Sequence, residues 1–118
     1  KNIEQVYADK LKVTDALVTR YHKMSLRTGN RKAFIDRAKT DFNLAEKVNL
    51  VKLKSVKTTT LLIWGAKDTW IPLGNGKRMD SMLPNSKLVI LKNSGHVPME
   101  ENPKESLEFL KSFLNESS

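Results

Sequence analysis

The sequence contains no cysteine, so neither a disulfide framework nor a thiolate metal site is available to it, and a reducing compartment, the cytoplasm, is expected. It has few aromatic residues, and it contains no nucleic-acid motif, phosphate-binding loop or metal-ligand spacing. No apolar run approaches the length of a membrane helix, and the N-terminus lacks the apolar core of a signal peptide. We therefore expect no cofactor, no metal, no nucleic-acid partner and no membrane partner.

The excess of positive charge lies in one half of the chain. Residues 1–57 contain 14 Lys and Arg against 6 Asp and Glu, whereas residues 58–118 contain 7 of each, and the net charge is +8. A basic surface for nucleic acid is one interpretation. The basic residues are, however, interleaved with acidic and apolar residues at helical spacing, which is typical of a solvated helical surface.

The 118 residues have room for one domain with a sizeable core, and the pattern changes near residues 56–59. We expect residues 1–56 to form a helical segment. It comprises a loop or short turn, a helix over 14–26 capped by Thr14, a second over 31–42 capped by Asn30, and a less regular third. The chain begins at Lys1 rather than at Met, which we interpret as the start of a piece of a longer protein.

Residues 57–118 have the pattern of a βαβα unit, so the predicted fold class is α/β with parallel strands. Residues 61–64 are apolar on both faces, as in a buried parallel strand, and 87–91 repeat the pattern. A helix over 77–83 connects the two strands, with residues 73–76 in the loop before it. Asn102, Pro103 and Glu105 predict a capping box at the start of a final amphipathic helix.

Each predicted strand is followed by a titratable residue, Asp68 after the first and His96 after the second. Open α/β sheets place their chemistry at the carboxyl ends of the strands. A carboxylate that accepts a hydrogen bond from one imidazole nitrogen fixes the tautomer, so the other nitrogen can act as a base. Taken singly, either residue is also common in a simple turn. Their occurrence after successive strands predicts a catalytic pair.

The stretch Gly65-Ala66-Lys67-Asp68, with Gly95-His96-Val97-Pro98 further on, resembles the C-terminal part of an α/β-hydrolase, and the resemblance covers residues 56–114. The upstream helices are similar to the end of a helical cap and the helix that returns to the sheet. The resemblance implies that Asp68 is the acid and His96 the histidine of a hydrolase that cleaves an ester, epoxide, haloalkane or C–C bond in a small molecule.

The nucleophile elbow of that family, Gly-x-Ser-x-Gly or its Asp variant, occurs nowhere in the sequence, and the oxyanion-hole strand and loop are also missing. We therefore expect a C-terminal fragment that has little or no activity alone. The alternative is a non-catalytic interaction domain that keeps the scaffold, with the acid and the histidine as relics.

Four apolar residues next to the pair are candidates for a substrate pocket: Trp70, Ile71, Val97 and Met99. Packing of the loops on one another would explain them equally well. Glu100 and Glu101 could bind a cation, but acidic residues before a helix need no such explanation. In the family, the first strand pairs on its other side with a strand missing here, so a free strand edge and apolar helix faces predict a homodimer or higher oligomer.

Overall fold

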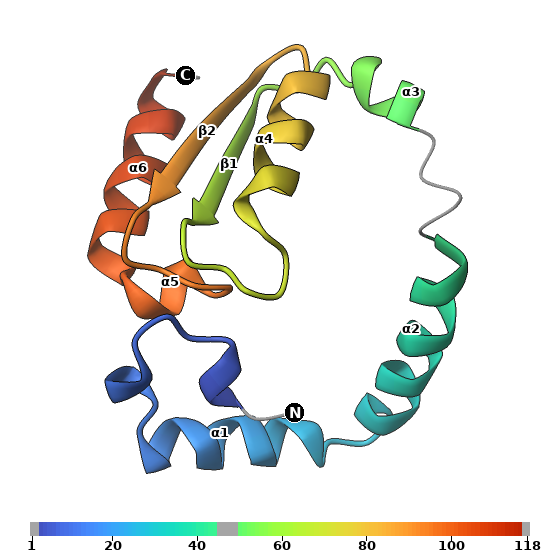
Figure 1. Ribbon diagram of the computed structural model, residues 1–118, viewed down its shortest axis with the longest axis vertical. Coiled ribbons are helices and arrows are strands. Elements are labelled where there is room, and N and C mark those ends of the chain that lie inside the picture. Colours follow the sequence, from blue (N-terminus) through green and yellow to red (C-terminus); the bar gives the residue numbers. More distant parts are fainter. Residues whose placement is uncertain (1–2, 45–49, 117–118) are drawn as a thin grey trace. The chain divides into compact units, whose positions relative to one another are not determined.

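The computed structural model describes residues 3–44 and 50–116 (Figure 1). Contacts divide the chain into two compact units: the sheet unit, Lys1–Val13 with Val51–Ser118, and the helical unit, Thr14–Leu50. In the described ranges, no helix combines the length and the apolar character needed to cross a membrane.

The sheet unit contains two parallel strands, β1 (Thr60–Gly65) and β2 (Ser86–Leu91), as predicted. Thr60 pairs with Ser86 at one end and Gly65 with Leu91 at the other, so the two strands end level with each other. Helix α4 (Leu73–Met82) connects them. The loops that follow β1 and β2 therefore start side by side at one edge of the sheet.

The strands are less buried than the sequence predicts. Leu91 is fully buried and Val89 nearly so, but Ile90 is 38% exposed and residues 60–64 of β1 are only half-buried. The prediction of a strand covered on both faces assumed a wider sheet. Only two strands occur in the described part of the chain, so each has one neighbour and less of its surface is covered.

Helices α4 and α6 (Pro103–Glu116) lie on opposite sides of the two strands, and the short helix α5 (Pro98–Glu101) lies near their carboxyl ends (Figure 1). Helix α4 begins four residues before the predicted start, so the prediction of a loop over 73–76 is wrong. Gly76 is buried there, and a Cβ atom on it would lie 2.7 Å from the Trp64 ring. This glycine permits close packing of helix and strand rather than marking a loop.

Helix α6 begins at Pro103, as predicted, but the side chain of Asn102 makes its hydrogen bonds to residues other than Glu105, so the expected capping box does not form. The side-chain NH₂ of Asn102 donates a hydrogen bond to the Ser94 hydroxyl, and its Oδ1 accepts from Lys12 Nζ at 3.1 Å. The backbone carbonyl of Asn102 accepts from the Ser106 N–H at 3.0 Å. The oxygen that would cap the helix is occupied by Lys12, 90 positions away in the sequence, and residue spacing alone cannot predict such a contact.

In the helical unit, α1 (Asp15–Ser25) begins as predicted, with the Thr14 hydroxyl accepting from the Leu17 N–H at 3.2 Å. Helix α2 (Asn30–Leu44) follows a turn in which Gly29 has a positive φ of 86°. The prediction that Asn30 caps α2 is wrong, because its side chain donates to the Met24 carbonyl (2.6 Å) at the end of α1.

The apolar residues of α2 that were predicted to face inward include Phe34 and Ile35, which are 75% and 52% exposed. The prediction assumed that another element packs against the face of α2 that carries Phe34 and Ile35. The contacts within the helical unit leave both side chains exposed. The predicted third helical stretch is present in part as α3 (Leu50–Lys54). Residues 45–49 lie outside the described ranges.

The first residues form two short 3-10 helices, η1 (Ile3–Gln5) and η2 (Lys10–Lys12), in the region predicted as a loop or short turn. Their contacts place Lys1–Val13 with the strands, although the sequence-based division grouped residues 1–56 together. The reason is a set of hydrogen bonds that join these residues to the loop after β2 and to helix α5. Their donors and acceptors are about 90 positions apart, so no local sequence pattern predicts them.

Candidate functional site

The loop after β1 holds a carboxylate in a fixed position. The N–H of Asp68 bonds to the Gly65 carbonyl at 3.3 Å, which folds the chain back directly after the strand. One oxygen of Asp68, Oδ1, accepts hydrogen bonds from the backbone N–H groups of Trp70 and Ile71, both at 2.9 Å. The side chain is only 5% exposed, so these two bonds replace the water it has lost.

The loop after β2 packs directly against this first loop. The Lys67 N–H donates to the Ser94 carbonyl at 2.9 Å, which joins the two loops backbone to backbone. A Cβ atom on Gly65 would lie 1.9 Å from the Gly95 carbonyl oxygen, a distance that no side chain can tolerate. Gly65 is therefore required for the close approach of the two loops.

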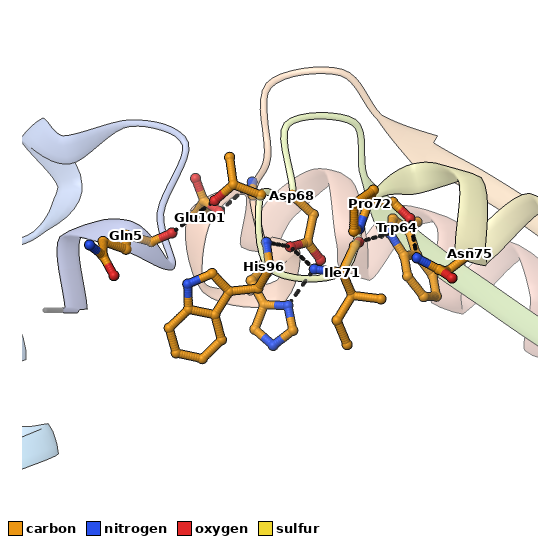
Figure 2. A network of polar contacts seen from close by, with 11 residues as sticks. Gln5, Trp64, Asp68, Ile71, Pro72, Asn75, His96 and Glu101 are labelled. Carbon is orange, nitrogen blue, oxygen red and sulfur yellow. Dashed lines mark hydrogen bonds and ion pairs between the residues drawn. The ribbon is translucent and has the colours of Figure 1, made fainter. Parts of the chain in front are cut away.

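This approach brings together the side chains of Asp68 and His96, the two residues that follow successive strands in the sequence. The second carboxylate oxygen of Asp68, Oδ2, lies 2.9 Å from His96 Nδ1 (Figure 2). The His96 side chain is 30% exposed, and no partner of its Nε2 atom is found among the described residues. Nδ1–H can donate to the carboxylate, which leaves Nε2 unprotonated and able to accept a proton.

The apolar candidates take different positions around the pair. The Trp70 ring lies beside the imidazole, with the centroids 5.3 Å apart and the planes at 39°. Ile71 is 42% exposed, and its carbonyl accepts from the Trp64 indole N–H (3.1 Å). Val97 is half-buried and Met99 is 62% exposed. Their role in a substrate pocket stays a prediction, but the amides of Trp70 and Ile71 hold the acid, which the sequence reasoning missed.

Two further groups that sequence reasoning missed contact the histidine loop. The His96 N–H donates to the Val6 carbonyl at 2.9 Å, and the Glu101 carboxylate, 2% exposed, accepts from the Gly95 N–H. The sequence left open a cation-binding role for Glu101, whereas its oxygens are occupied by backbone donors. No group of three or more potential metal ligands occurs among the described residues. The sequence spacing of Gly95 and Glu101 does not predict the hydrogen bond between them.

No protein-family model matches the chain. Among curated proteins, the chain is 40% identical over 63 residues to the uncharacterized hydrolase YugF of Bacillus subtilis (strain 168), a match that covers 53% of this chain and 23% of that protein. It is 36% identical over 45 residues to a 2-hydroxy-6-oxononadienedioate/2-hydroxy-6-oxononatrienedioate hydrolase of Pseudomonas putida, over 38% of this chain and 16% of that one. The chain thus matches about a quarter or less of the length of these relatives.

Solved structures extend the comparison to nearly the whole chain. A meta-cleavage product hydrolase from Pseudomonas fluorescens IP01 superposes with a TM-score of 0.84 over 98% of this chain and 44% of that one, at 21% sequence identity. An α/β-hydrolase from a Medee basin deep-sea metagenome library matches 97% of this chain and 42% of that one with a TM-score of 0.67, at 25% identity. These two relatives and two structural neighbours are named as hydrolases, and the chain has part of the α/β-hydrolase fold.

Proposed function

We propose that this chain supplies the acid and the histidine of a hydrolase that uses a nucleophile from outside these 118 residues. The observation that carries the proposal is the pairing of His96 Nδ1 with Asp68 Oδ2 at 2.9 Å at the carboxyl ends of two neighbouring strands. Asp68 is nearly buried, and its other oxygen is occupied by two backbone donors. It therefore orients the imidazole and stabilises the positive charge that forms on it.

In the proposed mechanism, His96 Nε2 removes the proton of a nucleophilic hydroxyl as that oxygen attacks a carbonyl carbon of the substrate. The imidazolium then gives this proton to the leaving group. A water molecule, deprotonated by His96 in the same way, then attacks the acyl carbon, and the imidazolium returns its proton to the nucleophile's oxygen as the bond between that oxygen and the acyl group breaks. Asp68 does not exchange protons in these steps, because its contribution is electrostatic and orientational.

The proposed substrate is a small molecule with a carbonyl group, cleaved at a C–C or ester bond. Support comes from the relative named as a hydrolase of a 2-hydroxy-6-oxo diacid and from the neighbours named as meta-cleavage product hydrolases. The tilted Trp70 ring beside His96, 44% exposed, offers an apolar surface next to the base.

The test is to express the full coding sequence of the source gene and to assay hydrolysis of p-nitrophenyl butyrate and of a 2-hydroxy-6-oxo-dienoate. We expect H96A and D68N each to lower kcat by about 10³-fold or more. The matched control is H22A, because His22 is exposed on α1 and lies outside the pair. Turnover that survives H96A would refute the proposed role, and so would the absence of any nucleophile in the full gene product.

A non-catalytic interaction domain is the second candidate, and exposed apolar surface favours it. The two-stranded sheet has an edge without a strand partner on each side in the described part of the chain, and α6 exposes apolar residues on its surface. These are Leu107, Phe109, Leu110 and Leu114. We propose that a second copy of the chain covers this surface, since paired edges and buried leucines would stabilise both copies.

Light scattering at micromolar concentration tests the self-association. We expect a homodimer or larger oligomer, and we expect L110E to shift it toward the monomer because a charge cannot be buried in an apolar contact. Glu108→Lys is the matched control, because residue 108 is an exposed polar position on the same helix. A strictly monomeric wild-type chain would refute self-association and leave the catalytic proposal untouched.

A further inference from the structure

The buried carboxylate of Glu101, at the end of α5, connects two distant segments of the sheet unit. Its Oε1 atom accepts a hydrogen bond of 2.5 Å from the Gly95 N–H, directly before the candidate base. Its Oε2 atom accepts from the N–H of Ala8 at 2.8 Å and, more weakly, from that of Asp9 at 3.4 Å. With 2% of its surface exposed, Glu101 depends on these backbone donors for its solvation.

The segment that Glu101 holds, residues 5–9, makes its own contact with the histidine. The Val6 carbonyl accepts from the His96 N–H at 2.9 Å. Gly95 lets the segment approach, because a Cβ atom there would lie 2.7 Å from the Val6 oxygen and 2.8 Å from the Ala8 nitrogen. Figure 2 shows Glu101 beside the loop from which His96 projects. The backbone of His96 is thus fixed by a segment that Glu101 anchors.

The same segment also reaches the acid loop. The Thr69 hydroxyl, one residue after Asp68, donates to the Gln5 carbonyl at 3.3 Å. The segment thus contacts both loops whose side chains form the pair.

We propose that Glu101 is a positioning residue for His96, which acts by clamping residues 5–9 against the histidine loop so that Nδ1 stays within hydrogen-bond distance of Asp68. The proposal rests on the proposed function, since it gives the clamp a purpose in catalysis. A carboxylate suits this role because both of its oxygens accept hydrogen bonds. A glutamine has one acceptor oxygen, so its NH₂ group would face an N–H donor at Gly95 or at Ala8 and one side of the clamp would open.

The test uses proton NMR of the 118-residue chain and needs no turnover. A proton shared between His96 Nδ1 and a carboxylate resonates far downfield of the amide region, and D68N identifies it by removing it. We expect E101Q to lose most of this signal while the far-UV circular dichroism is retained. We also expect the amides of Ala8 and Gly95 to exchange at least tenfold faster with solvent. The matched control, E105Q, changes an exposed glutamate four residues further on and should leave both readouts unchanged.

The outcomes separate the two proposals. If the wild-type chain shows no downfield proton that depends on Asp68, the pair itself is refuted and the proposed function fails. If the wild-type signal is present and E101Q keeps it at full intensity, the clamp is refuted while the pair stands. Should E101Q fail to fold, hydrogen exchange in the wild-type chain decides: Ala8, Gly95 and His96 should open together, and an Ala8 amide that exchanges more than tenfold faster than Gly95 would overturn the clamp.

Discussion

In the sheet unit, hydrogen bonds join residues as much as 93 positions apart, such as Ala8 and Glu101, whereas in the helical unit the caps and turns are local. The Thr14 cap spans three positions, and the bond from Asn30 to Met24 spans six. The difference extends to burial, because Leu91 is fully buried in the sheet unit while Phe34 of the helical unit is 75% exposed.

This comparison shows how each unit is stabilised. A fold held by distant contacts opens cooperatively, because breaking one contact releases the segments that it joined. Two helices with local contacts depend more on their intrinsic helix stability, which is small for lengths of 11 and 15 residues. The candidate site lies wholly in the sheet unit, where its two loops are held rigidly relative to each other.

The largest expected effect contrasts a buried and an exposed apolar residue. L91A should lower the free energy of unfolding of the sheet unit by about 2–5 kcal/mol, because it leaves a cavity at a fully buried position. F34A should change stability by less than about 0.5 kcal/mol, because the ring is already mostly in water. Urea denaturation of both variants measures this, and equal losses would contradict the assigned burial.

A pair of glycines in α4 offers a sharper contrast within the sheet unit. G76A should destabilise it by roughly 1–3 kcal/mol, because the added Cβ lies 2.7 Å from the Trp64 ring, which is fixed by its bond to the Ile71 carbonyl. G74A, two residues earlier, meets nothing within 4 Å and should stabilise the helix by about 0.5–1 kcal/mol. Thermal unfolding followed by circular dichroism should therefore show shifts of opposite sign.

In the helical unit, the largest local effect should come from the cap of α1. T14A removes the hydroxyl that accepts from the Leu17 N–H and should cost about 1 kcal/mol of helix stability. T14S keeps an acceptor and serves as the control. Hydrogen exchange of the first turn of α1 measures the effect, and the amides of β1 and β2 should be unchanged if the two units open separately.

The smallest expected effect concerns a surface ion pair of the sheet unit. Hydrogen bonds from Lys87 and Ser112 lower the pKa of Glu116 below its ordinary value. Because the lowered pKa belongs to the folded state, the pair stabilises at neutral pH, and this contribution is lost as the pH falls through the lowered pKa. K87A should raise the pKa of Glu116 toward the ordinary value, as an NMR titration of its carboxyl carbon would show. Stability should hardly change, since the pair is exposed.

The sequence by itself predicted the elements that local chemistry controls. Apolar runs located β1 and β2, a hydroxyl before an amphipathic stretch located α1, and the order of acid and histidine after successive strands identified Asp68 and His96 as a pair. These signals are readable because strand burial, helix capping and the geometry of parallel strands act over a few residues or follow from the order of elements.

Only the tertiary structure decided how the distant parts are used. It places Gly76 inside a helix against Trp64, turns the Asn102 side chain to Ser94 instead of to its own helix, and encloses Glu101 between two segments of the chain. It also leaves Phe34 exposed, although helical spacing predicted that this residue faces inward. Local patterns indicate which residues can be buried or can form a hydrogen bond. Which residue each of them contacts depends on how chain segments far apart in the sequence come together in space.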